Sequence, residues 1–325
     1  MEYEQKSEKE ISSEINEGFD SLDYTFDMLD YGVIYNKIFL LLPQNMIMFE
    51  EFGLEKLVAC EVICCAICHQ INWDYLRKAV YRKTLQNPEW VEVEYLVSIS
   101  VSEIKNLIDD YEKKERIQAD ERCKMIKIIA KRLKDANMTF LDIFMNNGNN
   151  RKYYEIERFF LNCSVFSKDP QQKKYQLLIQ TLSDYSYFKD LSDYYKPAID
   201  YHLIRLFLRR GVVRPKNKYA YQYVFEQDIV RRENTIAALR KVCSESLEDI
   251  CWITSLNLKA INRIEWWIGR TVCINDSPDC ELQKEDSKWL KKSFVKCPYY
   301  DTCYARKYNK NFLSINEPKY TGNSY

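Results

Sequence analysis

Apolar residues recur along most of the chain at helical spacing. Tyr175, Leu178 and Leu182 are three and seven positions apart, which places them on one face of a helix. The segment 121–133 shows the same period and leaves its basic residues on the opposite face, whereas 57–67 is apolar almost throughout and predicts a buried helix. Because the chain contains only 7 glycines and 8 prolines, the pattern predicts an all-α protein with long helices and short joints.

The composition agrees with a compact intracellular protein. A chain of 325 residues with 46% hydrophobic side chains can bury a large core, and we expect two helical lobes. No apolar run approaches the ~18 to 20 residues of a membrane span, and the first residues are acidic, unlike a signal peptide. Twelve cysteines fit a reducing compartment such as the cytoplasm. Of these, Cys60, Cys64, Cys65 and Cys68 are expected to be core residues of the apolar helix.

Four other cysteines form a spaced set near the C-terminus, with the pattern Cys273-x6-Cys280-x16-Cys297-x5-Cys303. Thiolates at this density can enclose a soft metal centre, because they stabilise iron–sulfur clusters and zinc. Zinc sites usually show two pairs with about two to four intervening residues, and neither pair here has that spacing. The sequence therefore favours a [4Fe–4S] cluster, with zinc or unliganded thiols as the alternatives.

A carboxylate is expected at the start of the helix that runs toward Gly211. The segment from Lys196 to Asp200 contains a proline turn, and the helical pattern begins directly after it. A carboxylate at a helix N-terminus meets free backbone N–H groups and the positive end of the macrodipole, which hold it ionised. Asp200 is therefore a catalytic candidate, with an ordinary N-cap as the alternative. His202 is a candidate for the same pocket or for a supporting role.

A pair of lysines precedes this aspartate at another predicted helix start, where Asp169 would be the N-cap and Pro170 the first helical residue. Lys173 and Lys174 fall in the first turn, where the macrodipole and the neighbouring ammonium both disfavour a positive charge. A neutral amine is what attack on a sugar carbon requires. Lys173 lies off the apolar face and is the preferred nucleophile. Lys174 is the alternative, and two solvated lysines are the remaining interpretation.

These segments resemble the helix–hairpin–helix (HhH-GPD) DNA glycosylase superfamily. The two halves of the cysteine set are similar to the cluster loop of endonuclease III-like glycosylases. The Pro-x-x-Asp-Tyr segment and the Gln-Lys pair before the apolar stripe are similar to the archaeal 8-oxoguanine DNA glycosylase family. The resemblance covers roughly residues 50–310. It implies an all-α, two-lobed fold, with a helical barrel lobe over 51–197 and a second lobe made of 1–50 plus 198–325.

The resemblance also implies residues that line a base pocket. Gln70 corresponds by position to a glycosylase side chain that fills the gap left by a flipped base. A polar turn that opens a helix from Asp74 to Arg82 is the alternative interpretation of this segment. Trp266 and Trp267, which directly precede the cysteine set, are further candidates for the pocket wall.

Charge is distributed unevenly, although the chain as a whole is neutral. Residues 1–60 contain 13 acidic and 4 basic side chains, whereas residues 201–244 contain 10 basic and 3 acidic ones. A local basic excess of this size can neutralise several phosphates, and a basic surface helix without a ligand is the alternative. The residues expected to contact DNA are Arg205, Arg209, Arg210 and Arg214.

The function implied by the resemblance is a DNA N-glycosylase with AP lyase activity, which excises a damaged or modified purine such as 8-oxoguanine from double-stranded DNA. The base is flipped from the helix, Asp200 stabilises the cationic sugar, and Lys173 attacks C1′ and forms a Schiff base. We expect a cytoplasmic, nucleoid-associated monomer without a membrane partner. Two alternatives remain open. One is an N-glycosylase of a modified nucleoside or nucleotide, like the queuosine-salvage relatives of this fold, and the other is a noncatalytic nucleic-acid-binding derivative.

Overall fold

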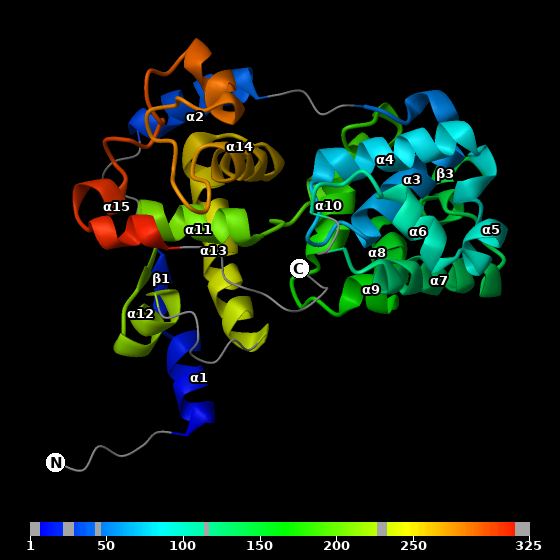
Figure 1. Ribbon diagram of the computed structural model, residues 1–325, viewed down its shortest axis with the longest axis horizontal. Helices are drawn as coiled ribbons and strands as arrows, with labels where there is room; N and C mark the ends of the chain where they lie inside the picture. Colours follow the sequence, from blue (N-terminus) through cyan, green and yellow to red (C-terminus); the bar gives the residue numbers. More distant parts are fainter. Residues whose placement is uncertain (1–6, 22–28, 43–46, 114–116, 226–232, 316–325) are drawn as a thin grey trace. The chain divides into compact units, whose positions relative to one another are not determined.

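The computed structural model describes residues 7–21, 29–42, 47–113, 117–225 and 233–315 (Figure 1). This part of the chain is mostly helical, as the apolar spacing predicts, and its strands form two short antiparallel pairs. It divides into two compact units. Unit 1 is built from the described residues of Met1–Gln44 and Lys196–Gly322, and unit 2 from those of Asn45–Tyr195. No helix in the described ranges is both long and apolar enough to cross a membrane.

Helix α3 (Leu54–Ala66) is the central element of unit 2. Ten of its 13 residues are buried, and α4, α7 and α10 pack against it, because a helix that is apolar on all sides must be covered on all sides. Cys60, Cys64 and Cys65 are fully buried, as expected, while Cys68 beyond the helix end is half-buried. The other elements of unit 2 are η1 (Glu50–Phe52), α4 (Trp73–Gln86), η2 (Pro88–Val91), α5 (Val93–Ser98), α6 (Val101–Leu107), α7 (Ala119–Asp135), η4 (Leu141–Ile143), β2 (Met145–Asn146), β3 (Asn149–Asn150), α8 (Tyr153–Leu161), α9 (Ser164–Ser167), α10 (Lys173–Leu182) and η5 (Ser186–Tyr194).

Helix α10 begins at Lys173, three residues after Pro170, which the sequence pattern predicted as its first residue. Asp169 is not the N-cap, because Gln172 has a left-handed backbone conformation, with φ of 52°, and separates Pro170 from the helix. The carboxylate of Asp169 nevertheless accepts a hydrogen bond from the backbone N–H of Lys173 at 2.9 Å. It therefore satisfies one of the free N–H groups at the helix start from outside the helix.

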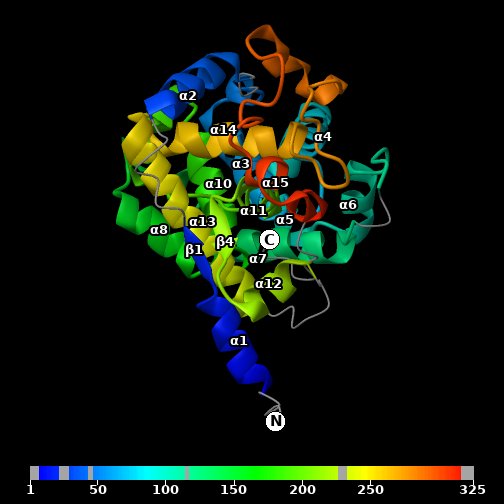
Figure 2. The ribbon, with the colours of Figure 1, turned by 90° about the vertical axis from the view of Figure 1, so that its left-hand side faces the viewer.

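Unit 1 is organised around three helices that pack against one another, α11 (Tyr201–Arg210), α13 (Glu233–Thr254) and α14 (Leu258–Thr271). Strands β1 (Phe19–Ser21) and β4 (Val213–Pro215) lie next to each other (Figure 2). Phe19 pairs with Pro215, so the N-terminal segment is joined to the chain that follows α11. The other elements of unit 1 are α1 (Glu8–Asn16), α2 (Leu29–Leu41), α12 (Lys218–Phe225), η6 (Glu285–Lys292), α15 (Tyr304–Lys307) and η7 (Lys310–Ser314).

Gly211 ends α11 with a backbone that favours glycine. Its φ is 76°, in the left-handed region, and the N–H of Val212 bonds to the carbonyl of Phe207 at 2.9 Å, which closes the last turn. A Cβ atom at this position would lie 2.6 Å from the Cβ atom of Tyr304. Both the turn and the close approach of α15 therefore require glycine here.

A buried ionic network links α3 to α4 in unit 2. The carboxylate of Glu61 is paired with the guanidinium group of Arg77, and the hydroxyl group of Tyr185 donates to the same carboxylate oxygen at 2.6 Å. Glu61 is fully buried, and Arg77 is 6% exposed. A carboxylate in this position is tolerated only because two donors replace its lost hydration.

Candidate functional site

The structure gives the two adjacent lysines of α10 different environments. Lys174 is buried, at 2% exposure, whereas Lys173 is half-buried. The Nζ atom of Lys174 donates a hydrogen bond of 2.7 Å to the carbonyl oxygen of Ala66 and lies 3.5 Å from the Sδ atom of Met125. Burial lowers the pKa of Lys174 from 10.5 to about 8. Burial is the largest cause of this shift; the charges of Lys173 and Arg122 act in the same direction, and Cys68 and Glu121 oppose them. The amine with the lowered pKa is therefore Lys174, although the sequence favoured Lys173.

The amine belongs to a group of four residues at the C-terminal end of α3, which we call the α3 cluster: Cys68, His69, Arg122 and Lys174. Arg122 is fully buried, and its guanidinium group donates to the carbonyl oxygens of Ile67, at 3.2 Å, and of His69. Two cationic side chains thus satisfy carbonyl groups at the negative end of a helix dipole. Neither cation forms an ion pair with a carboxylate in the part of the chain that the structure describes.

His69 lies in the interior of the same cluster. Its side chain is 1% exposed, and neither ring nitrogen has a hydrogen-bond partner among the residues that the structure describes. Burial, reinforced by the charges of Arg122 and Lys174, lowers the pKa of His69 to about 2. The imidazole is therefore neutral at physiological pH, so it adds no positive charge to the cluster.

The residues of the α3 cluster other than Lys174 were not among the expected site residues. For Arg122 a signal was present in the sequence. It lies four, seven and eleven positions before Ile126, Ile129 and Leu133, so it occupies the apolar face of α7. A charged residue at such a position is buried with partners or functional far more often than it is solvated. His69 carried no comparable signal, because only the fold decides which loop residues point inward.

Gln70 and its neighbours have a local structural role that the alternative interpretation anticipated. Gln70 is exposed and has a left-handed backbone, with φ of 53°. Two residues later, Asn72 is the N-cap of α4, and its side chain accepts from the N–H of Tyr75 at 3.1 Å. The segment is thus a polar turn that opens a helix, which begins at Trp73. The exposure of Gln70 leaves its side chain accessible to a ligand.

Asp200 is the N-cap of α11 in unit 1. Its Oδ1 atom accepts from the N–H groups of His202 and Leu203 at 2.9 and 3.1 Å, and its Oδ2 atom accepts from the indole N–H of Trp266 at 2.9 Å. Asp200 is 5% exposed, whereas Trp266 is half-buried. The expected position at a helix start is confirmed. These three donors stabilise a negative charge on the carboxylate.

The other residues expected near Asp200 lie around it in the same unit. The imidazole Nδ1 atom of His202 is 3.2 Å from a guanidinium nitrogen of Arg205. Its ring lies edge-on to that of Trp266, with 6.3 Å between centroids. Trp267 packs edge-on against Trp266 at 5.6 Å. The structure therefore brings Asp200, His202 and the two tryptophans together.

Three of the four arginines assigned to DNA contacts do not form a basic surface. Arg205, Arg209 and Arg210 are only 1%, 1% and 7% exposed. Arg205 donates to the carbonyl oxygens of Cys273 and Gly269 at 2.7 and 2.6 Å. The expectation of phosphate contacts is corrected for these three residues. Their guanidinium groups are buried and already bonded within unit 1, so they are not available to an external phosphate.

Arg209 and Arg210 hold the C-terminal part of unit 1 to α11. Arg209 donates to the carbonyl oxygens of Ile274 and Asn275, at 2.6 Å each, and of Ile315 at 3.0 Å. Arg210 is paired with the fully buried carboxylate of Glu265. Arginine suits both positions, because one planar guanidinium group with several donors can satisfy several acceptors in the interior.

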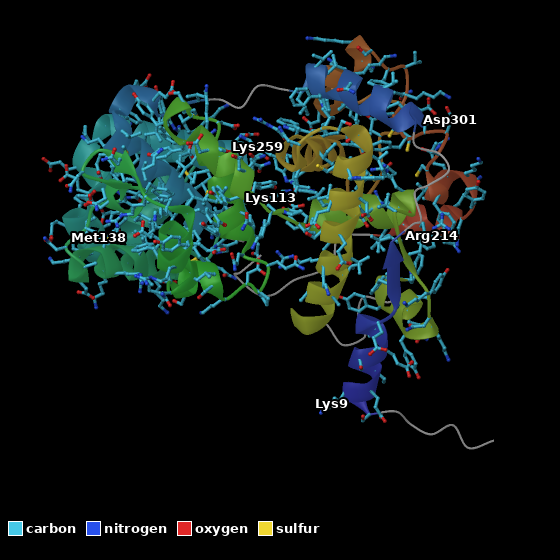
Figure 3. The ribbon with its side chains drawn as sticks, turned by 180° about the vertical axis from the view of Figure 1, so that it is seen from behind. Lys9, Lys113, Met138, Arg214, Lys259 and Asp301 are labelled. Carbon is cyan, nitrogen blue, oxygen red and sulfur yellow. The ribbon has the colours of Figure 1, made fainter. Side chains whose placement is uncertain are left out.

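Arg214 has a different environment. Arg214, labelled in Figure 3, is half-buried. Its Nε atom donates to the carbonyl of Gly211 at 3.1 Å, and its guanidinium group lies 4.4 Å from the ring centroid of Tyr304. Of the four arginines, this one keeps part of its side chain accessible.

All four C-terminal cysteines line one small cavity in unit 1. The backbone joins two of them directly, since the N–H of Cys297 donates to the carbonyl of Cys280 at 2.8 Å. Burial raises the pKa of the Cys280, Cys297 and Cys303 thiols. The spacing in the sequence thus corresponds to a real convergence in the fold, which brings together residues up to 30 positions apart.

The donor chemistry of this cavity fits a thiolate-ligated centre. Its lining includes four cysteines and the cationic side chains of Arg209, Arg210 and Arg306, and it includes no carboxylate or imidazole. A guanidinium nitrogen of Arg209 lies 3.6 Å from the Sγ atom of Cys273. Such cations stabilise the negative charge of metal-bound thiolates. The described residues contain no group of three or more His, Cys, Asp or Glu side chains already arranged to hold a metal ion.

No protein-family model matches the chain, and no curated protein matches it.

Proposed function

We propose that this protein is an N-glycosylase with AP lyase activity, that it excises a damaged or modified purine from double-stranded DNA, and that Lys174 is its nucleophile. The observation that carries the proposal is the buried amine of Lys174, whose pKa is lowered to about 8. An amine that attacks carbon must be neutral. With a pKa of about 8, on the order of a tenth of the enzyme carries a neutral amine at pH 7, compared with less than a thousandth for an unshifted lysine.

In the proposed reaction, the Lys174 amine forms a bond to C1′ of the deoxyribose. The glycosidic bond breaks, and the departing base takes the bonding electron pair and a proton. The departing base takes its proton from the attacking nitrogen. The sugar ring then opens, the ring oxygen O4′ takes the electron pair of the C1′–O4′ bond and the second proton of the nitrogen, and an imine forms between Nζ and C1′. Strand cleavage then follows by elimination at the abasic site. Because Lys174 is only 2% exposed, the reaction requires the α3 cluster to open, so that the amine exchanges its hydrogen bond with Ala66 for the substrate.

We propose separately that the carboxylate of Asp200, which belongs to unit 1, stabilises positive charge on a bound sugar. Support comes from its three hydrogen bonds from His202, Leu203 and Trp266, which fix a carboxylate at a helix start. Electrostatic stabilisation of this kind typically contributes a factor of ~10² or more to the rate.

We further propose that the cysteine cavity holds a [4Fe–4S] cluster, ligated by Cys273, Cys280, Cys297 and Cys303. Such a cluster would act as a structural tie, because its four ligands span the whole C-terminal segment of unit 1. Zinc is the alternative metal for the same four thiols.

Borohydride trapping tests the nucleophile directly. Borohydride reduces the imine to a stable amine, so that a labelled duplex containing 8-oxoguanine becomes covalently attached to the protein. We expect trapping by the wild type and none by Lys174→Arg, because a guanidinium group keeps a donor near Ala66 and forms no imine under these conditions. Lys173→Ala should retain trapping, and Lys124→Ala, which changes an exposed lysine of α7, is the matched control.

Each outcome separates one function from another. Full trapping by Lys174→Arg would exclude Lys174 as the nucleophile. If Lys173→Ala, and not Lys174→Arg, abolishes trapping, Lys173 is the nucleophile. Release of a base from a free nucleoside, without trapping on duplex DNA, would indicate a nucleoside N-glycosylase. If folded wild-type protein releases no base and traps no substrate across a panel of lesion duplexes and nucleosides, the N-glycosylase proposal is refuted.

A further inference from the structure

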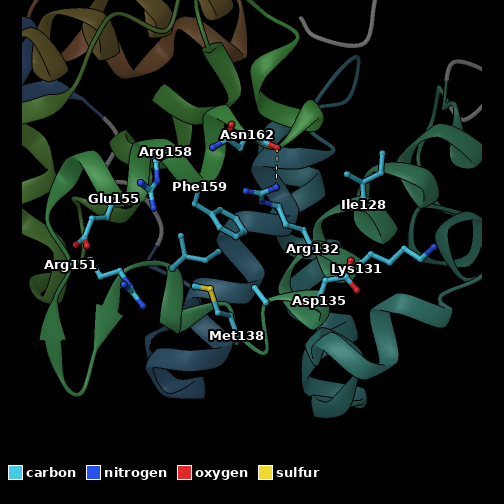
Figure 4. Close-up of a pocket in the computed structure, with 12 residues that line it drawn as sticks. Ile128, Lys131, Arg132, Asp135, Met138, Arg151, Glu155, Arg158, Phe159 and Asn162 are labelled. Atoms are coloured by element: carbon cyan, nitrogen blue, oxygen red, sulfur yellow. Dashed lines mark hydrogen bonds between the residues drawn. The ribbon is translucent and has the colours of Figure 1, made fainter.

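Unit 2 contains a surface pocket that the proposed chemistry does not use. It lies between α7 and α8, at the surface of this unit, and its volume is about 660 Å³ (Figure 4). This size falls within the range of roughly 300 to 1,000 Å³ that is usual for sites of small organic ligands. Its residues come from α7, from α8 and from the segment between these helices.

The lining of this pocket has an excess of positive charge. It includes four cationic side chains and two carboxylates, namely Lys131, Arg132, Arg151, Arg158, Asp135 and Glu155. One of the carboxylates is already engaged, since Glu155 accepts from the backbone N–H of Lys152 at the start of α8. No ion pair within the described ranges involves any of the four cations. An anionic ligand would therefore meet positive charge that the protein itself does not neutralise.

Arg132 lines the pocket with a guanidinium group that the protein holds in place. One terminal guanidinium nitrogen donates to the carbonyl of Asn162 at 3.1 Å, shown as a dashed line in Figure 4. Its Nε atom is buried and has no hydrogen-bond partner in the described structure. The bond to Asn162 fixes the position of this guanidinium group beside the pocket.

The pocket also has an apolar side. The ring centroid of Phe159 lies 5.0 Å from the Cζ atom of Arg132. The other apolar residues of the lining are Ile128, Ala136, Met138 and Ile143. Arg151 is held in place by a bond of 2.7 Å from its Nε atom to the carbonyl of Asp142. Fixed guanidinium groups next to an aromatic ring suit a phosphate attached to an organic group, because arginine binds phosphate through paired donors.

We propose that the pocket between α7 and α8 is a binding site for the phosphate group of a nucleotide, either free or within a single-stranded nucleic acid. The guanidinium groups of Arg132, Arg151 and Arg158 bind the phosphate oxygens, and the apolar side contacts the nucleoside. This site is independent of the N-glycosylase proposal, because it uses other residues and concerns binding alone.

The test measures binding of three probes to the full chain: adenosine 5′-monophosphate, adenosine and a fluorescent single-stranded oligonucleotide. Titration calorimetry serves for the small probes and fluorescence anisotropy for the oligonucleotide. The variant is Lys131→Glu/Arg158→Glu, which reverses two exposed charges of the pocket. The matched control is Lys78→Glu/Lys124→Glu, which makes the same change of net charge at two exposed lysines outside it.

We expect the wild type to bind adenosine monophosphate at least about tenfold more tightly than adenosine, because charge-assisted hydrogen bonds to phosphate contribute that much or more. The pocket variant should lose at least about tenfold in affinity for the monophosphate, and the control should stay near wild type. A loss confined to the monophosphate identifies free nucleotide as the ligand. An additional loss for the oligonucleotide, with a shallower salt dependence, identifies backbone phosphate.

Three results would overturn the proposal. Equal affinity for adenosine and its monophosphate would show that phosphate is not recognised. Equal weakening in the pocket variant and the control would show that the effect is one of net charge. Absence of binding to the monophosphate and the oligonucleotide by folded wild-type protein, verified by circular dichroism, would show that the pocket is not a phosphate site.

Discussion

Replacement of Lys174 by methionine should change how the stability of the protein depends on pH. In the folded protein the pKa of Lys174 is lowered from 10.5 to about 8, whereas in the unfolded chain the side chain is hydrated and titrates near 10.5. Between these two values the unfolded chain binds more protons than the folded protein does. The wild type therefore becomes more stable as the pH rises through this window, and the methionine variant lacks this contribution.

The magnitude follows from the size of the shift. One pKa unit corresponds to about 1.36 kcal/mol, so the fall from 10.5 to about 8 amounts to about 3 kcal/mol between the two ends of the window. Below pH 8 the folded protein contains a buried ammonium at nearly the full desolvation cost, and above pH 10.5 neither state is charged. Relative to Lys174→Met, the wild-type free energy of unfolding should therefore rise by about 3 kcal/mol from pH 8 to pH 10.5.

Urea denaturation at half-unit pH steps, followed by circular dichroism, measures this difference. Comparison of the two proteins cancels the titration of the many tyrosines, which is common to both. Lys124→Met serves as the control, because Lys124 is an exposed lysine of α7, and its difference from the wild type should be flat. Parallel curves for the wild type and Lys174→Met would refute the reasoning, since they would show that the amine is not desolvated in the folded protein.

Three further predictions concern other parts of the chain. Glu61→Gln should lower the free energy of unfolding by about 3 kcal/mol, because it leaves the buried guanidinium group of Arg77 without its counter-charge; a urea midpoint near that of the wild type would contradict this. Anaerobically purified protein should be brown and contain about four irons per chain, and Cys297→Ser should lose both; stoichiometric zinc without iron would exclude the cluster. Asp200→Asn should slow base excision by on the order of 10²-fold while lesion-duplex binding persists, and full excision by this variant would remove Asp200 from the mechanism.

The sequence by itself determined the helical class and the position of several elements. The stripe of Tyr175, Leu178 and Leu182 is fully buried, because period and polarity are local properties that any helical packing must respect. The N-cap at Asp200 could also be predicted from the local sequence, since it depends only on a carboxylate and the next three backbone N–H groups. The cysteine spacing indicated a common site, and the four residues do line one cavity.

Only the tertiary structure decided which charged residues are buried. The run of arginines in α11 has the composition of a basic surface, yet Arg205 and Arg209 are interior because carbonyl oxygens distant in the sequence converge on them. In the same way, the sequence places Lys173 off the apolar face of α10, but only the end of α3, about a hundred residues earlier, provides the carbonyl oxygen to which the buried Lys174 donates. The pKa of a lysine depends on what surrounds it in space, so the choice between these two neighbours had to await the packing of α10 on α3.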